Sequence, residues 1–183
     1  MLTIGLVELN SIARGIETCD IMAKASDVEL IDSYPVCPGK YIIMVSGNVA
    51  AVQSSVERGI ETASANFVDK LILPHVHPQV IPGLMGTAQT DHIQAVGILE
   101  TFSVASAIIA ADASLKAARV DIIEIRIAKG LGGKSFYTLT GNVAEVQAAI
   151  DSAALIVEKE GVLVYKTVIP NPHESLKQQL LEW

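Results

Sequence analysis

Short apolar runs and longer helical stripes alternate along the chain in a fixed order. An apolar run ahead of Ser11 has the length of a β-strand, and from Ile12 apolar residues recur at the spacing of an amphipathic helix. Two strand-like runs, a second helical stripe from Val49 and a closing strand follow. The strands are expected at residues 3–9, 28–34, 40–46 and 69–76.

This strand–helix–strand–strand–helix–strand order predicts the α/β (α+β) class. It is typical of a ferredoxin-like domain, with a mostly antiparallel sheet and both helices on one face. Ser11 and Asn48 occupy helix N-cap positions. The stripes expected to face the core are Ile12, Ile16, Cys19 and Ala23 in the first helix and Val49, Val52, Val56, Ile60 and Ala63 in the second.

The whole pattern is present twice. The segment from Ile4 returns from Val96 at one offset, and GNVAAVQ from Gly47 returns as GNVAEVQ from Gly141. Because solenoid repeats span only about 20 to 50 residues, a repeat of half the chain predicts two tandem domains, residues 1–90 and 91–183. Residues 79–94, rich in turn formers, are expected to link them. The first core stripe recurs as Val104, Ile108, Ala111 and Leu115.

Composition and charge exclude two classes of partner. A net charge of -7 and a pI near 5.0 give no basic field for nucleic acid or anionic lipid. No apolar run reaches the roughly 18 residues of a membrane span. The amino terminus lacks the features of a signal peptide, which predicts a cytoplasmic protein. With 50% hydrophobic residues, the surplus apolar surface is expected at subunit interfaces.

The segment AKGLGGKS, Ala128 to Ser135, is close to a phosphate-binding loop. Such a loop opens a helix whose amides hold phosphate, whereas FYTLTG after Ser135 is β-rich. We therefore expect no nucleotide site, and interpret the glycines as allowing backbones to crowd near a symmetry axis. A nucleotide-binding enzyme is kept as the alternative from another functional class.

The histidines and one of the two cysteines carry weak signals. His75, His77 and His173 lack the ligand spacing of a zinc site and are expected at the surface or at an interface. Cys19 lies on the first core stripe, which predicts a buried, inert thiol. Two cysteines in a reducing compartment do not indicate a disulfide framework.

Cys37 differs, because it lies between prolines in the short loop SYPVCPGKY. The loop offers exposure, and Lys40 close by favours the thiolate needed for metal ligation or redox chemistry. A cysteine followed by proline also occurs among iron-sulfur ligands. An ordinary exposed thiol is the alternative.

Several segments together resemble the shell-protein domain of bacterial microcompartments. They are the GLVE and GILE strands, the DIMAKAS and DASLKAA helices, the GNVA turns and the terminal VIPNPH. Within that family the chain is most similar to tandem-domain shell proteins of propanediol-utilisation compartments that carry an iron-sulfur cluster. That subgroup has a CPGK loop, here Cys37, Pro38, Gly39 and Lys40, and a GxGGK loop in its second domain.

The resemblance implies a non-enzymatic shell subunit that forms a homotrimer, in which six domains make a pseudohexameric tile. One 4Fe-4S cluster per trimer is expected at the central pore, held by three Cys37 thiolates, with a non-protein ligand on the fourth iron. The cluster implies electron transfer across the shell, and the expected partners are other shell proteins and an encapsulated redox enzyme. A plain metabolite pore without a cluster is the alternative. The expected pore loop of the second domain is Lys129, Gly130, Leu131, Gly132, Gly133 and Lys134.

The resemblance also assigns residues to the edge where tiles meet. Lys24 and Lys116 match the edge lysine of the family's first helix. Asn171 and His173 lie in PNPH, where the family has PRPH, so Asn171 stands at the position of an edge arginine. Solvated lysines at both positions are the alternative.

Overall fold

The structure is a computed structural model that describes residues 2–90 and 92–182. It consists of two units, one reaching to Val76 and the other beginning at His77. The first unit contains β1 Thr3–Leu9, α1 Ile12–Ala25, β2 Val28–Val36, β3 Lys40–Gly47, α2 Val49–Ala63, the 3-10 turn η1 Ser64–Asn66 and β4 Phe67–Leu73. The second contains α3 Val80–Met85, β5 Ala95–Thr101, α4 Val104–Ala117, β6 Asp121–Ile127, β7 Ser135–Gly141, α5 Val143–Lys159, β8 Leu163–Ile169 and α6 Glu174–Leu181.

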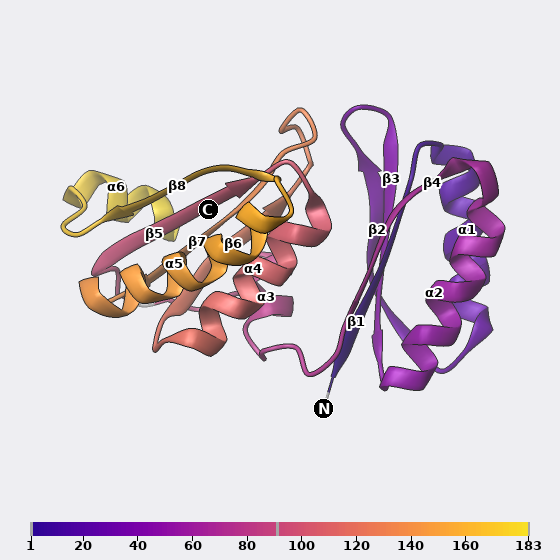
Figure 1. Ribbon diagram of the computed structural model, residues 1–183, viewed down its shortest axis with the longest axis horizontal. Helices are drawn as coiled ribbons and strands as arrows, with labels where there is room; N and C mark the ends of the chain where they lie inside the picture. The colour runs from indigo at the N-terminus through magenta and orange to yellow at the C-terminus, as the bar shows by residue number, and fades with distance from the viewer. Residues whose placement is uncertain (1, 91, 183) are drawn as a thin grey trace. The chain divides into compact units, whose positions relative to one another are not determined.

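Each unit is built on one antiparallel sheet of four strands. The strand order is β2-β3-β1-β4 in the first unit and β6-β7-β5-β8 in the second. Within each unit, the two helices of the repeat cover one face of its sheet (Figure 1). Even the irregularities repeat, since the register shifts between Leu30 and Asp32 and again between Ile122 and Glu124. The predicted fold class is confirmed.

Local chemistry explains where the helices begin. The Ser11 hydroxyl accepts the Arg14 N–H, and the Asn48 side chain accepts the Ala51 N–H, as the N-cap prediction requires. Ser103 and Asn142 cap the corresponding helices of the second unit. These caps satisfy amide groups that a helix start leaves without a partner.

A repeated glycine sets how closely helix and sheet approach. A Cβ atom at Gly97 would lie 2.7 Å from Ile150 and 2.8 Å from Val146 on α5. Strand side chains alternate between faces, so Val96 and Ile98 point away from α5. Helix α6 packs there, because Leu176 and Leu180 join the cluster that contains Val96 and Ile98.

The core stripe predicted for α1 is wrong at three of its four positions, and only Cys19 packs partly against the core. Ile12 and Ile16 are 43% and 58% exposed, and Ala23 is exposed. The face that α1 buries carries Gly15, Thr18 and Met22. A Cβ atom at Gly15 would lie 2.4 Å from the Tyr41 ring, so the absence of a side chain lets the helix approach β3.

The other stripes are closer to the prediction. Val52, Val56 and Ala63 of α2 are fully buried and Ile60 packs partly against the core, whereas Val49 at the start of the helix is 37% exposed. In α4 the predicted stripe is buried throughout. Its members are Val104, Ile108, Ala111 and Leu115.

The segment expected to be a linker contains helix α3. This short helix packs against β6, where Gly83 lies beside Ile122 and Ile125. The division at Val76 and His77 therefore precedes the domain boundary that we predicted after residue 90. Among the described residues, no helix is both long enough and apolar enough to cross a membrane.

Candidate functional site

Cys37 lies at the tip of the β2–β3 hairpin. Val36 pairs with Lys40 in the strand register, so only Cys37, Pro38 and Gly39 make the turn. The free Cys37 thiol is half-buried, and Pro38 and Gly39 are exposed. Gly39 has a left-handed backbone, and a Cβ atom there would meet nothing within 4 Å. Two of the three residues of the turn are thus open to solvent, and the thiol is partly so.

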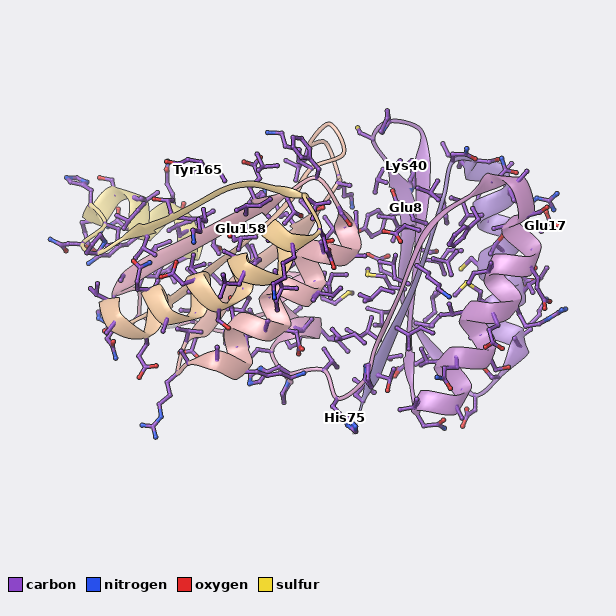
Figure 2. All side chains as sticks on the ribbon, in the orientation of Figure 1. Glu8, Glu17, Lys40, His75, Glu158 and Tyr165 are labelled. Atoms are coloured by element: carbon purple, nitrogen blue, oxygen red, sulfur yellow. The ribbon has the colours of Figure 1, made fainter. Side chains whose placement is uncertain are left out.

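Lys40 forms an ion pair with a residue of β1, a central strand of the first sheet. Its Nζ lies 2.8 Å from Oε1 of Glu8, whose side chain is only 6% exposed (Figure 2). Glu8 on β1 is paired with Ile42 on the neighbouring β3, which brings the carboxylate to the base of the hairpin. The charge of Lys40 is therefore largely compensated inside the chain, and a buried glutamate is satisfied by the same contact.

The predicted pore loop of the second unit joins β6 to β7. It closes on itself, because the Ala128 N–H donates to the Lys134 carbonyl at 3.0 Å. Gly130 and Gly132 have left-handed backbones, and a Cβ atom at either would meet nothing within 4 Å. Within one chain the glycines thus serve backbone conformation, and crowding near a symmetry axis, which would involve other chains, stays a prediction.

The second loop repeats the lysine contact of the first. Lys134 Nζ lies 2.8 Å from Oε1 of Glu100, and Glu100 occupies the position in β5 that Glu8 occupies in β1. The glutamate of the GLVE and GILE strands thus anchors a loop lysine in both units. Ser135 begins strand β7 and not a helix, so the lookalike segment lacks the helix N-terminus that binds phosphate.

The remaining cysteine and the histidines contribute no metal site. Cys19 is half-buried and packs against the core of the first unit. His77 and His173 use their Nδ1 atoms to accept backbone N–H groups two residues ahead, at 3.3 Å, and His173 caps α6. His75 is exposed. The described part of the chain contains no group of three or more His, Cys, Asp or Glu residues that could hold a metal ion.

The residues predicted for the tile edge have different surroundings. Lys24 is 73% exposed and pairs with Asp20 at 2.7 Å. Lys116 pairs at 2.6 Å with Asp112, whose other oxygen accepts the His77 N–H. Asp112 is buried, so only Lys24 resembles an ordinary solvated charge. Asn171 is exposed and lines a hollow of about 340 Å³.

A second hollow contains a charged residue that the sequence analysis missed. It measures about 480 Å³ and is lined by the end of α3, by β6 and by the end of α6. Glu124 is 6% exposed there, and its Oε2 accepts the Arg126 Nε–H at 2.7 Å. Its Oε1 has no hydrogen-bond partner. The available signal was one glutamate between the isoleucines at 122, 123 and 125 of the segment DIIEIRI.

Burial affects the titration of this glutamate. It raises the pKa of Glu124, because the charged form loses hydration, and Arg126 only partly offsets the effect. The carboxyl group is thus held in a hollow with a mixed polar and apolar lining, and one of its two oxygens has no hydrogen-bond partner.

Comparison with known proteins identifies the class that this fold represents. The family model described as the BMC domain matches residues 3–76 and 95–172, so the chain belongs to that family through two tandem copies. It is a structural shell protein of bacterial microcompartments, and not an enzyme.

Individual relatives support this assignment. The chain is 43% identical to the bacterial microcompartment shell protein PduT of Citrobacter freundii, over 98% of this chain and 97% of the relative. The shell protein EutM of Salmonella typhimurium (strain LT2) is 36% identical over 47% of this chain and 88% of its own length.

Solved structures agree with the fold. The crystal structure of a microcompartment protein from Desulfitobacterium hafniense DCB has a TM-score of 0.95 and 52% identity, covering 97% of this chain and 99% of the other. A fused permuted hexameric shell protein from the RMM microcompartment has a TM-score of 0.59 at 20% identity, covering 86% and 85%. That second likeness concerns the fold alone.

Proposed function

We propose that three copies of this shell protein close into a pseudohexameric tile, and that their Cys37 thiolates hold one 4Fe-4S cluster at the central pore. The observation that carries the proposal is the position of Cys37. It lies at the tip of an exposed three-residue turn in the first unit, whereas the second unit has no cysteine in its loop. A ring of three chains therefore presents three equivalent thiols.

The ligand chemistry fits a cluster shared between chains. A single chain offers one loop thiolate, and no group of three ligands exists within its described residues. A 4Fe-4S cube has a threefold axis through one iron, so three related cysteines would leave that iron to a ligand from outside the protein. When bound, the cluster would carry single electrons across the shell. An encapsulated redox enzyme is the partner that this role requires.

The surface of α1 supports the ring. Ile12 and Ile16 are exposed, while their equivalents Val104 and Ile108 in α4 are 2% and 0% exposed. The same helix face is thus covered in one repeat and bare in the other. A closed ring would cover the bare face with another copy and leave no interface open.

The proposal is tested on protein purified without oxygen. Iron, acid-labile sulfide, visible absorption and electron spin resonance are measured on the wild type, on Cys37→Ser and on Cys19→Ala. We expect Cys37→Ser to lose iron and chromophore while the oligomer persists, because an exposed turn contributes little to folding. Cys19→Ala is the matched control and should keep both. A wild type that stays colourless after reconstitution would leave the plain metabolite pore as the function.

A further inference from the structure

Helices α3 and α6 are additions to the repeat, and they border a hollow on the second sheet. Neither helix has an equivalent among the described residues of the first unit. The hollow of about 480 Å³ lies between the end of α3, the edge strand β6 and the end of α6. Every described residue that lines it belongs to the second unit. The hollow is thus complete within one chain, without the ring or the cluster.

Hydrogen bonds and apolar packing hold the walls of the hollow in place. Gln79, which precedes α3, donates from Nε2 to the Asp121 carboxylate and accepts the Ile122 N–H on Oε1, both at 2.8 Å. Beyond α3, the Thr90 hydroxyl donates to the Ile122 carbonyl at 3.1 Å. On the other side, Leu180 of α6 packs into an apolar cluster of the second unit. The hollow is therefore preformed, as small-molecule sites usually are.

The hollow offers a buried acceptor that no group of the chain satisfies. The Glu124 side chain is 8% exposed, and Arg126 donates to its Oε2 only. Its Oε1 is buried without a partner, and so is the hydroxyl of Thr138, the residue opposite Glu124 in the strand register. A buried carboxylate oxygen without a donor is costly, and native proteins rarely retain one. A bound molecule with N–H groups would supply the missing donor.

Charge and apolar surface indicate the class of that molecule. Of the described residues that line the hollow, Glu124 and Glu182 are acidic, and Arg126 alone is basic. One negative charge is therefore left without a counter-charge in the lining. Met85 and Leu181 also line the hollow, and both are exposed. This combination favours a ligand that has a cationic group and a short apolar chain.

We propose that the hollow binds a small primary ammonium compound, whose N–H groups donate to the unpartnered oxygen of Glu124. Rotation about the terminal side-chain torsion of Glu124, which is soft, turns that oxygen toward the ligand. The apolar chain of the ligand covers Met85 and Leu181 and removes their surface from water. In the first unit, Asp32 occupies the position of Glu124, and its Oδ1 accepts the Ser33 N–H at 2.8 Å. Asp32 thus provides a matched control.

Binding is measured on the full chain by NMR of isotope-labelled methionine methyl groups, with the Met85 signal assigned from a Met85→Leu variant. The probe is n-butylammonium at about pH 8, where an alkylammonium keeps its proton as lysine does. The neutral n-butanol has the same chain. We expect a saturable shift of the Met85 signal with a Kd on the order of a millimolar. n-Butanol should bind at least about tenfold more weakly, because it brings no charge to Glu124.

Three variants locate the site, and circular dichroism verifies that each folds. Glu124→Gln should raise the Kd for n-butylammonium at least about tenfold, because it removes the carboxylate that the ammonium group contacts. Ala88→Phe, which fills the hollow, should abolish the shift. Asp32→Asn should bind like the wild type.

The proposal would be overturned by a wild type without a saturable shift, by equal affinities for the amine and the alcohol, or by unchanged binding in Glu124→Gln. Each of these results would leave the tile and its cluster as they stand, because the hollow is complete within one chain.

Discussion

At the scale of single residues, the buried acids Glu8 and Glu124 differ in the partners that the chain supplies for their carboxylate oxygens. Glu8 receives the ammonium of Lys40 on Oε1 within its own unit. Glu124 accepts a hydrogen bond from Arg126 on one oxygen only. Besides these two residues, Glu182 is the charged residue that lines the hollow, and helix α3 contributes Gly83, Leu84 and Met85. The chain thus supplies no partner for one buried oxygen of Glu124.

The stability of the folded chain should depend on the ionisation of Glu124. Because burial raises the pKa of Glu124, its charge is lost at a higher pH than the usual value of about 4.3. The folded chain favours the protonated form of Glu124. The resulting contribution to the free energy of unfolding is lost as the pH rises through the raised pKa.

We therefore expect the free energy of unfolding of the wild type to contain a component that falls as the pH rises through the raised pKa of Glu124, measured by urea titrations at a series of pH values. Glu124→Gln should lose this component, while the effects of exposed carboxylates stay. Equal pH dependence in wild type and variant would show that burial does not raise the pKa of Glu124.

At the scale of elements, the two loops at the expected pore share one anchor. Each loop leads into a strand, β3 or β7, that pairs with the glutamate-bearing strand of its sheet, β1 or β5. A lysine where the loop meets that strand forms an ion pair with the glutamate. The environments differ, since the side chain of Glu8 is 6% exposed and that of Glu100 is 31% exposed. The two repeats therefore contain equivalent ion pairs that differ in how deeply the glutamate is buried.

Lys40→Met and Lys134→Met make the same change in the two repeats. Lys40→Met should lower the free energy of unfolding of the first unit by about 1–2 kcal/mol, because it leaves a buried carboxylate without a partner. Lys134→Met should cost less, since water can reach Glu100. Urea titrations followed by circular dichroism compare the two midpoints. Equal losses would contradict the role given to burial.

At the scale of the whole molecule, the chain is a two-domain shell subunit whose outer contacts decide whether tiles join. The side chain of Lys24 is more exposed than that of Lys116. Its ion pair with Asp20 lies at the surface, where such a pair contributes little to stability. Lys116 forms an ion pair with the buried Asp112, so moving Lys116 away would leave that carboxylate without its cation. The two lysines are equivalent in sequence, but only Lys24 can exchange its partner freely.

Lys24→Asp should impair the formation of two-dimensional arrays while the individual tile persists. Reversing an exposed charge costs about 1 kcal/mol per contact, and the cost adds over the many contacts of an array. Electron microscopy of the arrays and light scattering of the tile measure the two effects. Lys159→Asp, a reversal at the exposed end of α5, is the control. Unchanged arrays for Lys24→Asp would make this lysine an ordinary solvated charge.

The sequence by itself determined the duplication, the order of elements and the position of Cys37 in a turn between two strands. These features depend on local spacing, which apolar period, N-caps and Gly or Pro residues encode directly. Ser11 and Asn48 therefore marked the helix starts correctly. The metal ligand role of Cys37 came from a family resemblance, and it stays a prediction.

Only the tertiary structure decided which faces are buried and which charges meet. Periodicity shows that α1 is amphipathic, but glycine at position 15 allows contact with Tyr41 and so turns Ile12 and Ile16 outward. The pairing of Lys40 with Glu8 and the unpartnered oxygen of Glu124 join residues far apart in sequence, or depend on packing around them. Such contacts follow from strand register and helix packing, and no local pattern of residues encodes them.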